Sequence, residues 1–154
     1  MPNPSLQDEI KKKKPFDFPE QEAFLNIIRT ASFLDAEFDA LFKSHGLSSA
    51  QYNVLRILRG EGERMPSLAV AERLVTRVPD ITRLVDRLER ASLVRRERCK
   101  KDRRVVYVSI TSKGQALLAT LDEPVRRLHR EQLAHMSKAD LADLSRLLTA
   151  ARSP

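Results

Sequence analysis

The sequence predicts a mostly helical protein that carries one small β-hairpin. From Glu20 onward, apolar residues recur at three- and four-residue spacing, which is typical of helices with one buried face. One segment breaks this pattern, because residues 94–99 and 105–110 alternate apolar and polar side chains as two antiparallel strands do. A charged tip, Lys100–Arg104, lies between these strands. Helices therefore precede and follow a single hairpin.

Length and composition favour a nucleic-acid partner. The chain has 154 residues, which suits one domain with helical extensions, and its net charge is +7. No apolar run approaches the roughly 18 residues of a membrane span, no signal peptide is recognisable, and the sequence holds no basic amphipathic anchor helix. A membrane is therefore not expected as partner. The single cysteine, Cys99, cannot form an internal disulfide, which predicts a cytoplasmic protein.

The first part of the chain predicts an arm and two helices. Residues 1–19 lack a steady period and are expected to form a mostly flexible, basic arm. Residues 20–44 form the first long helix, with Gly46 as its left-handed stop. Ser48 and Gln51 have the spacing of a capping box, which starts a helix that reaches about Arg59 before residues 60–63 break the chain.

Two short helices are expected before the hairpin. Ser67 is expected to cap a helix over 68–74, and a turn leads into a helix that starts at Pro79, since a first turn needs no N–H from its proline. Asp80 suits the positive end of this helix. The buried stripe is Ile81, Leu84, Val85 and Leu88, which leaves Thr82, Arg83 and Arg87 on other faces.

Two further helices are expected after the hairpin. Thr111 or Ser112 caps a long helix over about 113–134, which Pro124 is expected to kink or split. Ser137 then caps a final helix that carries four leucines.

The positive charge of the chain is local. Residues 95–104 hold seven cations against two carboxylates, a net +5, and Lys11–Lys14 adds +4, which leaves −2 for the rest of the chain. A helix pair followed by a charged hairpin is the winged helix-turn-helix arrangement. Its second helix enters the major groove of DNA, and its hairpin, the wing, lies along the backbone or dips into the minor groove. We therefore predict a protein that binds double-stranded DNA.

The candidate DNA contacts come from two elements. They are Arg77, Asp80, Thr82, Arg83 and Arg87 on or just before the recognition helix, and Lys100, Lys101, Arg103 and Arg104 on the wing. Asp102 lies among these cations and is assigned a different role. It is two residues from Arg104 and can hold that guanidinium in one rotamer by a charge-assisted pair, without touching DNA.

A family resemblance rests on the same residues. Asp102-x-Arg104, followed by Val108, Ile110, Thr111 and Gly114, resembles the D-x-R-x-x-x-V-x-L-T-x-x-G signature of the MarR (multiple antibiotic resistance regulator) family. Residues 81–89 are similar to the family's recognition helix, and the likeness spans roughly residues 24–150.

The resemblance implies an architecture and partners. A MarR-type domain over 20–154 would be a homodimer in which dimerisation helices 20–44 and 113–152 interlock, and the two winged helix-turn-helix lobes, residues 48–112, would straddle one operator. Arg104 would enter the minor groove. A small aromatic or phenolic effector would bind in a cleft between each lobe and the dimer stalk.

The chain departs from the family pattern at residues 77–80. Arg-Val-Pro-Asp stands there in place of the small Ser- and Thr-rich start that is common to the recognition helix. Asp80 would repel phosphate unless it accepts a hydrogen bond from a cytosine amino group.

Two function classes stay open at this point. The first is a ligand-responsive regulator, in particular a repressor on a pseudo-palindromic operator, and the second is a winged-helix module that binds an acidic protein. An enzyme has little support, because no Ser/His/Asp order, cleft-like carboxylate pair or phosphate loop is present. Neither a cofactor nor a metal is expected.

Several residues keep alternative interpretations. Lys11–Lys14 is either a solubilising tail or an arm that touches DNA, and Cys99 is a plain strand residue or a redox sensor. His45 and Tyr52 are candidate polar groups of an effector pocket. The six phenylalanines, all within the first 42 residues, are expected in core and dimer packing.

Overall fold

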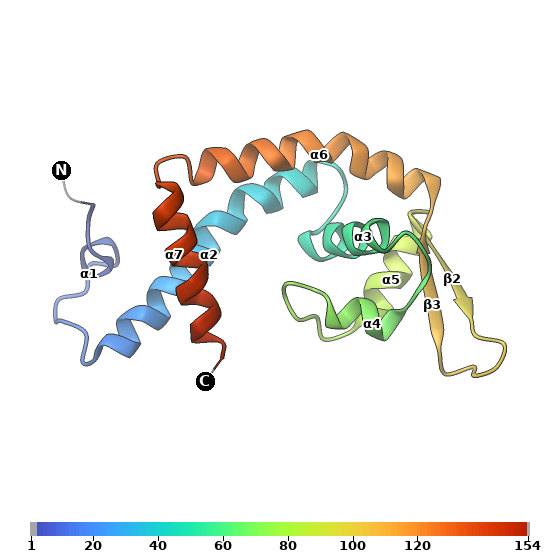
Figure 1. Ribbon diagram of the computed structural model, residues 1–154, viewed down its shortest axis with the longest axis horizontal. Coiled ribbons are helices and arrows are strands. Elements are labelled where there is room, and N and C mark those ends of the chain that lie inside the picture. Colours follow the sequence, from blue (N-terminus) through green and yellow to red (C-terminus); the bar gives the residue numbers. More distant parts are fainter. Residues whose placement is uncertain (1–2, 154) are drawn as a thin grey trace.

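A computed structural model describes residues 3–153 of the chain and confirms the mostly helical fold with its small β-sheet. The elements in chain order are α1 (Leu6–Glu9), α2 (Pro19–Ser44), α3 (Ser49–Glu61), β1 (Met65–Pro66), α4 (Ser67–Glu72), α5 (Ile81–Arg90), β2 (Val94–Arg98), β3 (Val106–Ile110), α6 (Ser112–Gln132) and α7 (Lys138–Ala151). Figure 1 shows two halves: a lobe made of α3, α4, α5 and the strands, and a stalk made of α2, α6 and α7.

The sheet has three strands, one more than expected. Its order is β1-β3-β2, and both pairs are antiparallel. The hairpin pairs Val94 with Ile110 and Arg98 with Val106, close to the predicted strands. The unexpected strand β1 adds only two residues, with Met65 opposite Val108. This short strand covers the outer edge of β3 and so anchors the wing to the segment that precedes α4.

Local capping signals place most helix starts. Ser48 and Gln51 form the predicted capping box at α3, Thr111 accepts from the Gly114 amide at α6, and Ser137 caps α7 together with Asp140. Each cap satisfies backbone donors that would otherwise lack a partner. The positions of these helices therefore follow from sequence neighbours alone.

Three predicted boundaries were wrong in detail. Helix α3 continues to Glu61, because Gly62, with φ +79°, adopts the left-handed conformation that ends it. Ser67 is the first residue of α4, and Pro66 occupies the cap position without a side-chain bond. The recognition helix α5 begins at Ile81 instead of Pro79, because Asp80 is its cap.

Helix α6 is not split at Pro124. It is one unbroken helix from Ser112 to Gln132. Leu118, Leu121 and Val125 are buried on both sides of the proline, so their packing holds the helix together where one backbone bond is missing.

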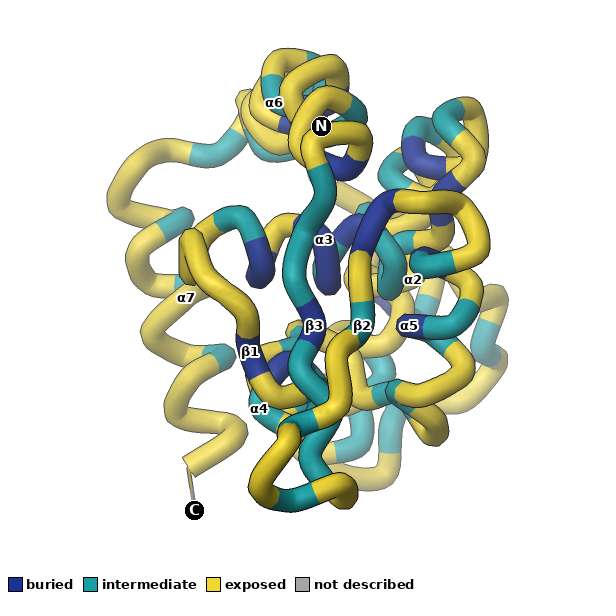
Figure 2. Tube along the Cα trace, turned by 90° about the vertical axis from the view of Figure 1, so that its right-hand side faces the viewer, coloured by how far each residue is buried: buried dark blue, intermediate teal, exposed yellow. Residues whose placement is uncertain are grey.

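The core lies in the lobe and under α6. The side chains that are at most 1% exposed come from four helices and one strand. They are Val54, Leu55 and Leu58 of α3, Val70 of α4, Val85 and Leu88 of α5, Val108 of β3, and Leu118 and Leu121 of α6. Figure 2 shows buried segments in α3, in α5 and in the strands of the sheet. The lobe therefore has a hydrophobic core of its own.

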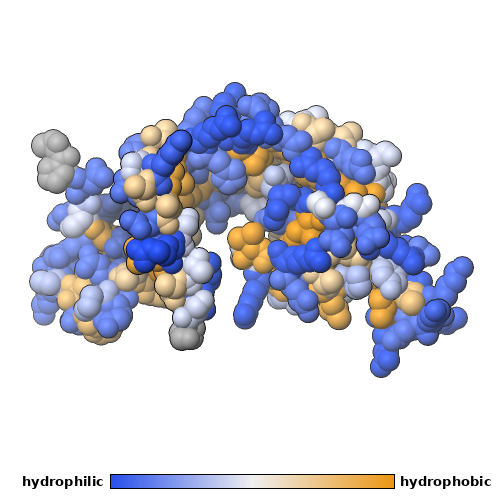
Figure 3. Space-filling model, in the orientation of Figure 1, coloured by the Kyte–Doolittle hydropathy of each residue, from blue (hydrophilic) through white to orange (hydrophobic). Residues whose placement is uncertain are grey.

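The stalk, in contrast, buries little. Within α2 only Phe42 is buried, and α7 has no buried residue. Phe24 is 61% exposed, Phe33 is 72% exposed and Leu147 is 57% exposed. Figure 3 shows apolar surface on both halves and a hollow between them beneath α6. The stalk thus leaves apolar faces without a partner within residues 3–153.

The N-terminal segment is more ordered than the expected flexible arm. Helix α1 begins with a capping box between Ser5 and Asp8, and Leu6 is buried. Glu9 pairs with Arg29 of α2 at 2.5 Å. A short capped helix thus packs on α2 here, whereas Met1 and Pro2 of the predicted arm, like Pro154 at the other end, lie outside the described residues.

Candidate nucleic-acid interface

The recognition helix α5 is oriented by its cap and its buried face. Asp80 Oδ1 accepts a hydrogen bond from the Arg83 backbone N–H at 3.1 Å, and Val85 and Leu88 are buried in the lobe. Thr82, Arg83 and Arg87 are exposed, as predicted.

The Asp80 carboxylate has a second neighbour that was not predicted, the Arg83 side chain. Besides capping α5, its Oδ2 lies 3.9 Å from Arg83 Nε. A hydrogen bond from a cytosine amino group would compete with this cap. That contact stays a prediction.

The wing tip contains the predicted orienting pair. Arg104 Nε and Nη2 donate to the two oxygens of Asp102 at 3.1 and 3.2 Å, and the Arg104 backbone N–H donates to the same carboxylate at 3.0 Å. These bonds hold the pKa of Asp102 below its ordinary value. The Arg104 side chain is nevertheless 91% exposed. The guanidinium is therefore fixed in direction and still open to a partner.

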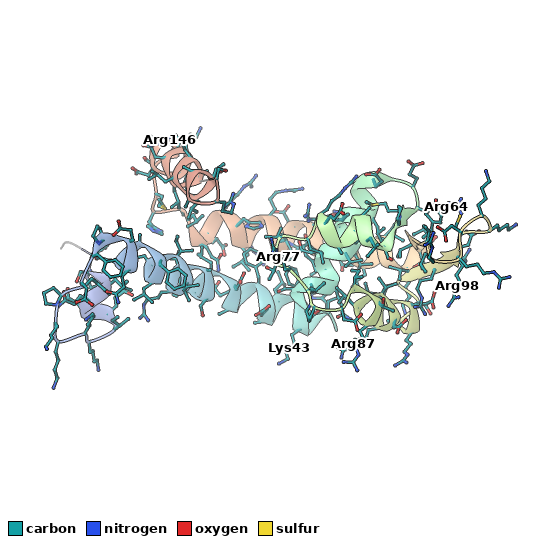
Figure 4. All side chains as sticks on the ribbon, turned by 90° about the horizontal axis from the view of Figure 1, so that it is seen from below. Lys43, Arg64, Arg77, Arg87, Arg98 and Arg146 are labelled. Carbon is teal, nitrogen blue, oxygen red and sulfur yellow. The ribbon has the colours of Figure 1, made fainter. Side chains whose placement is uncertain are left out.

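The other predicted wing cations are also exposed. Lys100, Lys101 and Arg103 are all on the surface, and none forms an ion pair within residues 3–153. Figure 4, seen from below, places Arg87 and Arg98 at the lobe end and Arg77 nearer the middle of the molecule. Arg77 is exposed and lies farther from the wing than Arg87 does in this view.

Arg96 has a structural role that the count of charges over residues 95–104 did not show. Its backbone N–H and its guanidinium donate to Glu89 of α5, at 2.8 Å from N, 3.2 Å from Nε and 3.0 Å from Nη2. The same guanidinium pairs with Asp86. These hydrogen bonds lower the pKa of Glu89. Arg96 therefore links the recognition helix to the wing, and the spacing of Asp86 and Glu89 on one helical face was the available signal.

Arg64 supports the wing from the other side. Its Nη1 donates to Glu97 at 3.1 Å, and its guanidinium lies 4.4 Å from the Tyr107 ring centroid. Glu97 and Tyr107 are opposite each other in the β2–β3 register. A cation placed over this pair stabilises the hairpin close to its charged tip.

The start of α6 is packed tightly against the hairpin. Thr111 Oγ1 donates to the Ser92 carbonyl at 2.7 Å, and the Thr111 N–H donates to the Leu93 carbonyl at 3.1 Å. A Cβ on Gly114 would lie 2.4 Å from the Leu93 carbonyl oxygen and 2.8 Å from Ile110 Cγ1. Only glycine fits this close approach, which explains the glycine of the predicted signature in physical terms.

A cleft lies between the stalk and the lobe. It has a volume of about 820 Å³ and is lined by α2, α3, the α4–α5 loop and α6. Tyr52 lines this cleft and stacks on Phe42 at a centroid distance of 4.2 Å, and burial raises the pKa of its hydroxyl. His45 does not line the cleft, because its Nδ1 lies 3.0 Å from the Leu41 carbonyl at the end of α2. His129, which packs on Phe38, is the histidine at this site.

Comparisons with known proteins agree with this geometry. The sequence profile of the MarR family matches residues 47–106. The homoprotocatechuate degradative operon repressor of Escherichia coli is 31% identical over 111 residues, which cover 72% of this chain and 74% of the repressor. A MarR transcription factor from Planctomyces limnophilus is 44% identical, and its crystal structure matches with a TM-score of 0.68 over 88% of this chain and 99% of that one. The chain belongs to the MarR family.

Other MarR structures share the fold at lower identity. AbsC from Streptomyces coelicolor is 24% identical, with a TM-score of 0.76 over 91% of this chain and 96% of that one. MarR family proteins are transcription regulators that bind DNA, and they are not enzymes, which agrees with both sequence predictions at the level of the family. Among residues 3–153, no helix is both long and apolar enough to cross a bilayer.

Proposed function

We propose that this MarR family protein is a repressor that binds a pseudo-palindromic operator as a homodimer in the cytoplasm. The observation that carries the proposal is the exposed Arg104 guanidinium, held in one direction by Asp102 at the wing tip. An arginine with a fixed direction enters a narrow minor groove without losing side-chain entropy at that step. Thr82, Arg83 and Arg87 of α5 would face the major groove.

The apolar stalk supports the homodimer. Four large apolar side chains on these two helices are more than half exposed, which is unusual for a monomer: Phe24, Ile28 and Phe33 of α2, and Leu147 of α7. A groove of about 970 Å³ between α1 and α2 is lined partly by Leu25, Ile28 and Phe33. A second copy of the chain would bury these faces. Its lobe would then sit about one helical turn, ~34 Å, from the first, as two successive major grooves require.

The stalk–lobe cleft is the proposed effector site. It combines stacked aromatic rings, Phe42 and Tyr52, with polar groups of Arg56 and His129, which suits a small phenolic ligand. The Escherichia coli relative is named as repressor of a degradative operon, and this context motivates the class of effector. A ligand that prefers a different lobe spacing releases DNA only to the extent of its differential affinity for the two states.

A fluorescence anisotropy titration tests the proposal. The purified protein is titrated into labelled duplex from its own upstream region, with an unrelated duplex as competitor. Arg104→Ala is expected to weaken operator binding by about 1–3 kcal/mol, the range for a specific groove contact. Arg130→Ala, which removes an exposed cation from α6, is the matched control. If neither duplex binds and an acidic protein does, the winged-helix interaction module is the correct function.

A further inference from the structure

Four consecutive lysines, Lys11–Lys14, lie on an ordered loop between α1 and α2. We name residues 10–18 the basic loop. Its first end is fixed by the Ser5–Asp8 capping box, by burial of Leu6 and by the pair between Glu9 and Arg29. The loop's backbone is held as well, since Gln7 Nε2 donates to the Lys12 carbonyl at 3.2 Å. The lysines therefore extend from a defined position, in contrast to those of a free tail.

The four charges lack a carboxylate partner. No ion pair within residues 3–153 involves Lys11–Lys14, and the neighbouring carboxylates of Asp8 and Glu9 are engaged with Ser5 and Arg29. Lys11, Lys13 and Lys14 are exposed, and the Lys12 ammonium lies 5.5 Å from the Phe16 ring centroid. The basic loop also contains Asp17, so its net charge is +3. Four cations in four residues, none of them in an ion pair, still produce a local field that attracts a polyanion.

The basic loop lies on the same side of the molecule as the wing. Figure 1 shows the segment between α1 and α2 at the lower left and the β2–β3 tip at the lower right, both below α6. The two basic segments thus stand at opposite ends of the long axis and extend to one common side. This placement favours DNA over a second, unrelated partner, because one duplex already lies on that side if the proposed function holds.

We propose that the basic loop is a second DNA contact, which binds backbone phosphates outside the base pairs that α5 and the wing recognise. This inference rests on the proposed function. Lysine ammonium groups act as point charges, and they lack the planar fork with which arginine recognises guanine. The contact therefore adds affinity without sequence preference.

The test is the salt dependence of DNA binding by the full-length protein. A variant with all four lysines of the loop changed to glutamine is compared with wild type on operator and on unrelated duplex, from 50 to 200 mM salt. The control variant changes Lys43, Arg130, Lys138 and Arg152 to glutamine, four exposed cations that form no ion pair among residues 3–153, so the loss of charge is equal. Light scattering checks that this control keeps the mass of wild type. A second variant, with the four lysines changed to arginine, keeps the charge. Circular dichroism confirms that each variant is folded.

Loss of one phosphate contact per subunit should flatten the slope of log K against log salt by about 2. Raising the salt from 50 to 200 mM should then weaken binding by a factor that is about ten times smaller for the glutamine variant than for wild type. This difference should be the same on both duplexes. The arginine variant should behave as wild type, and so should the control. An unchanged slope in the glutamine variant would overturn the inference, and so would an equal change in the control, which would show an effect of net charge alone. Absence of any DNA binding by wild type would instead end the proposed function and this inference together.

Discussion

Arg96 offers the sharpest test of how the recognition surface is held together. Replacing it with alanine removes its hydrogen bonds to Glu89 and its pair with Asp86, both on α5. The three side chains are 33%, 37% and 35% exposed, so the network is neither buried nor fully solvated. Breaking a buried pair costs about 3–5 kcal/mol and breaking an exposed one at most about 1 kcal/mol. After allowance for solvent screening, we expect Arg96→Ala to lower the free energy of unfolding by roughly 1–2 kcal/mol.

Arg95→Ala is the matched control for this prediction. Arg95 is the neighbouring residue on β2, carries the same charge, is exposed and forms no ion pair among residues 3–153. Its removal should change stability by no more than about 0.5 kcal/mol. Urea denaturation of both variants at pH 7 measures the difference. Equal losses would refute the assignment of Arg96 as the link between helix and wing.

The same network predicts a pH dependence. Arg96 lowers the pKa of Glu89, so this carboxylate becomes protonated at a lower pH in the folded state than in the unfolded state. The resulting stability is fully present above the unfolded pKa of a glutamate and is lost as the pH falls through the lower folded value. The stability difference between wild type and Arg96→Ala should therefore shrink as the pH falls from about 5 to about 3. A difference that persists undiminished at pH 3 would contradict this account.

Three further predictions concern the framework around this surface. Gly114→Ala should destabilise the protein by about 1–3 kcal/mol, because its Cβ would meet the Leu93 carbonyl, whereas Gly60→Ala, with open space around it, should be neutral or slightly stabilising in thermal melts. Asp122→Ala should cost about 1 kcal/mol or less, since the side chains of its bidentate pair with Arg59 between α6 and α3 are 40% and 36% exposed, and a double-mutant cycle would isolate that coupling. Phe33→Glu should convert the proposed dimer into a folded monomer in light scattering, and an unchanged mass would remove α2 from the interface.

Features that depend on near neighbours in the sequence could be predicted. The capping boxes at Ser48 and Ser137 join residues three apart, and the Asp102–Arg104 pair joins residues two apart. The hairpin was also predictable, because its strands are adjacent in the chain and alternate cleanly. In each case the partner lies within a few residues or across a single turn, so chain geometry alone brings the groups together.

Features that depend on tertiary contact could not be predicted in the same way. Strand β1 is two residues long and contains Pro66, and only its position beside β3 makes it a strand. The cation–π contact of Arg64 with Tyr107 joins elements that are far apart in the sequence. The stacking of Tyr52 on Phe42 likewise depends on how α2 meets α3. Sequence periodicity contains no information on which distant side chains share a cavity.

The structure also shows that the cations of the wing are not equivalent. A count over residues 95–104 treats its cations as equivalent, but Arg96 faces inward to two carboxylates of α5, while Arg104 is oriented outward by Asp102. One arginine therefore braces the wing, and the other is the proposed DNA contact. Together with the Thr111 bonds to Ser92 and Leu93, these contacts join α5, the wing and the start of α6 into one unit. Because the lobe is braced in this way and the stalk–lobe cleft is open, an effector in that cleft would change the spacing between lobes more readily than the shape of either one.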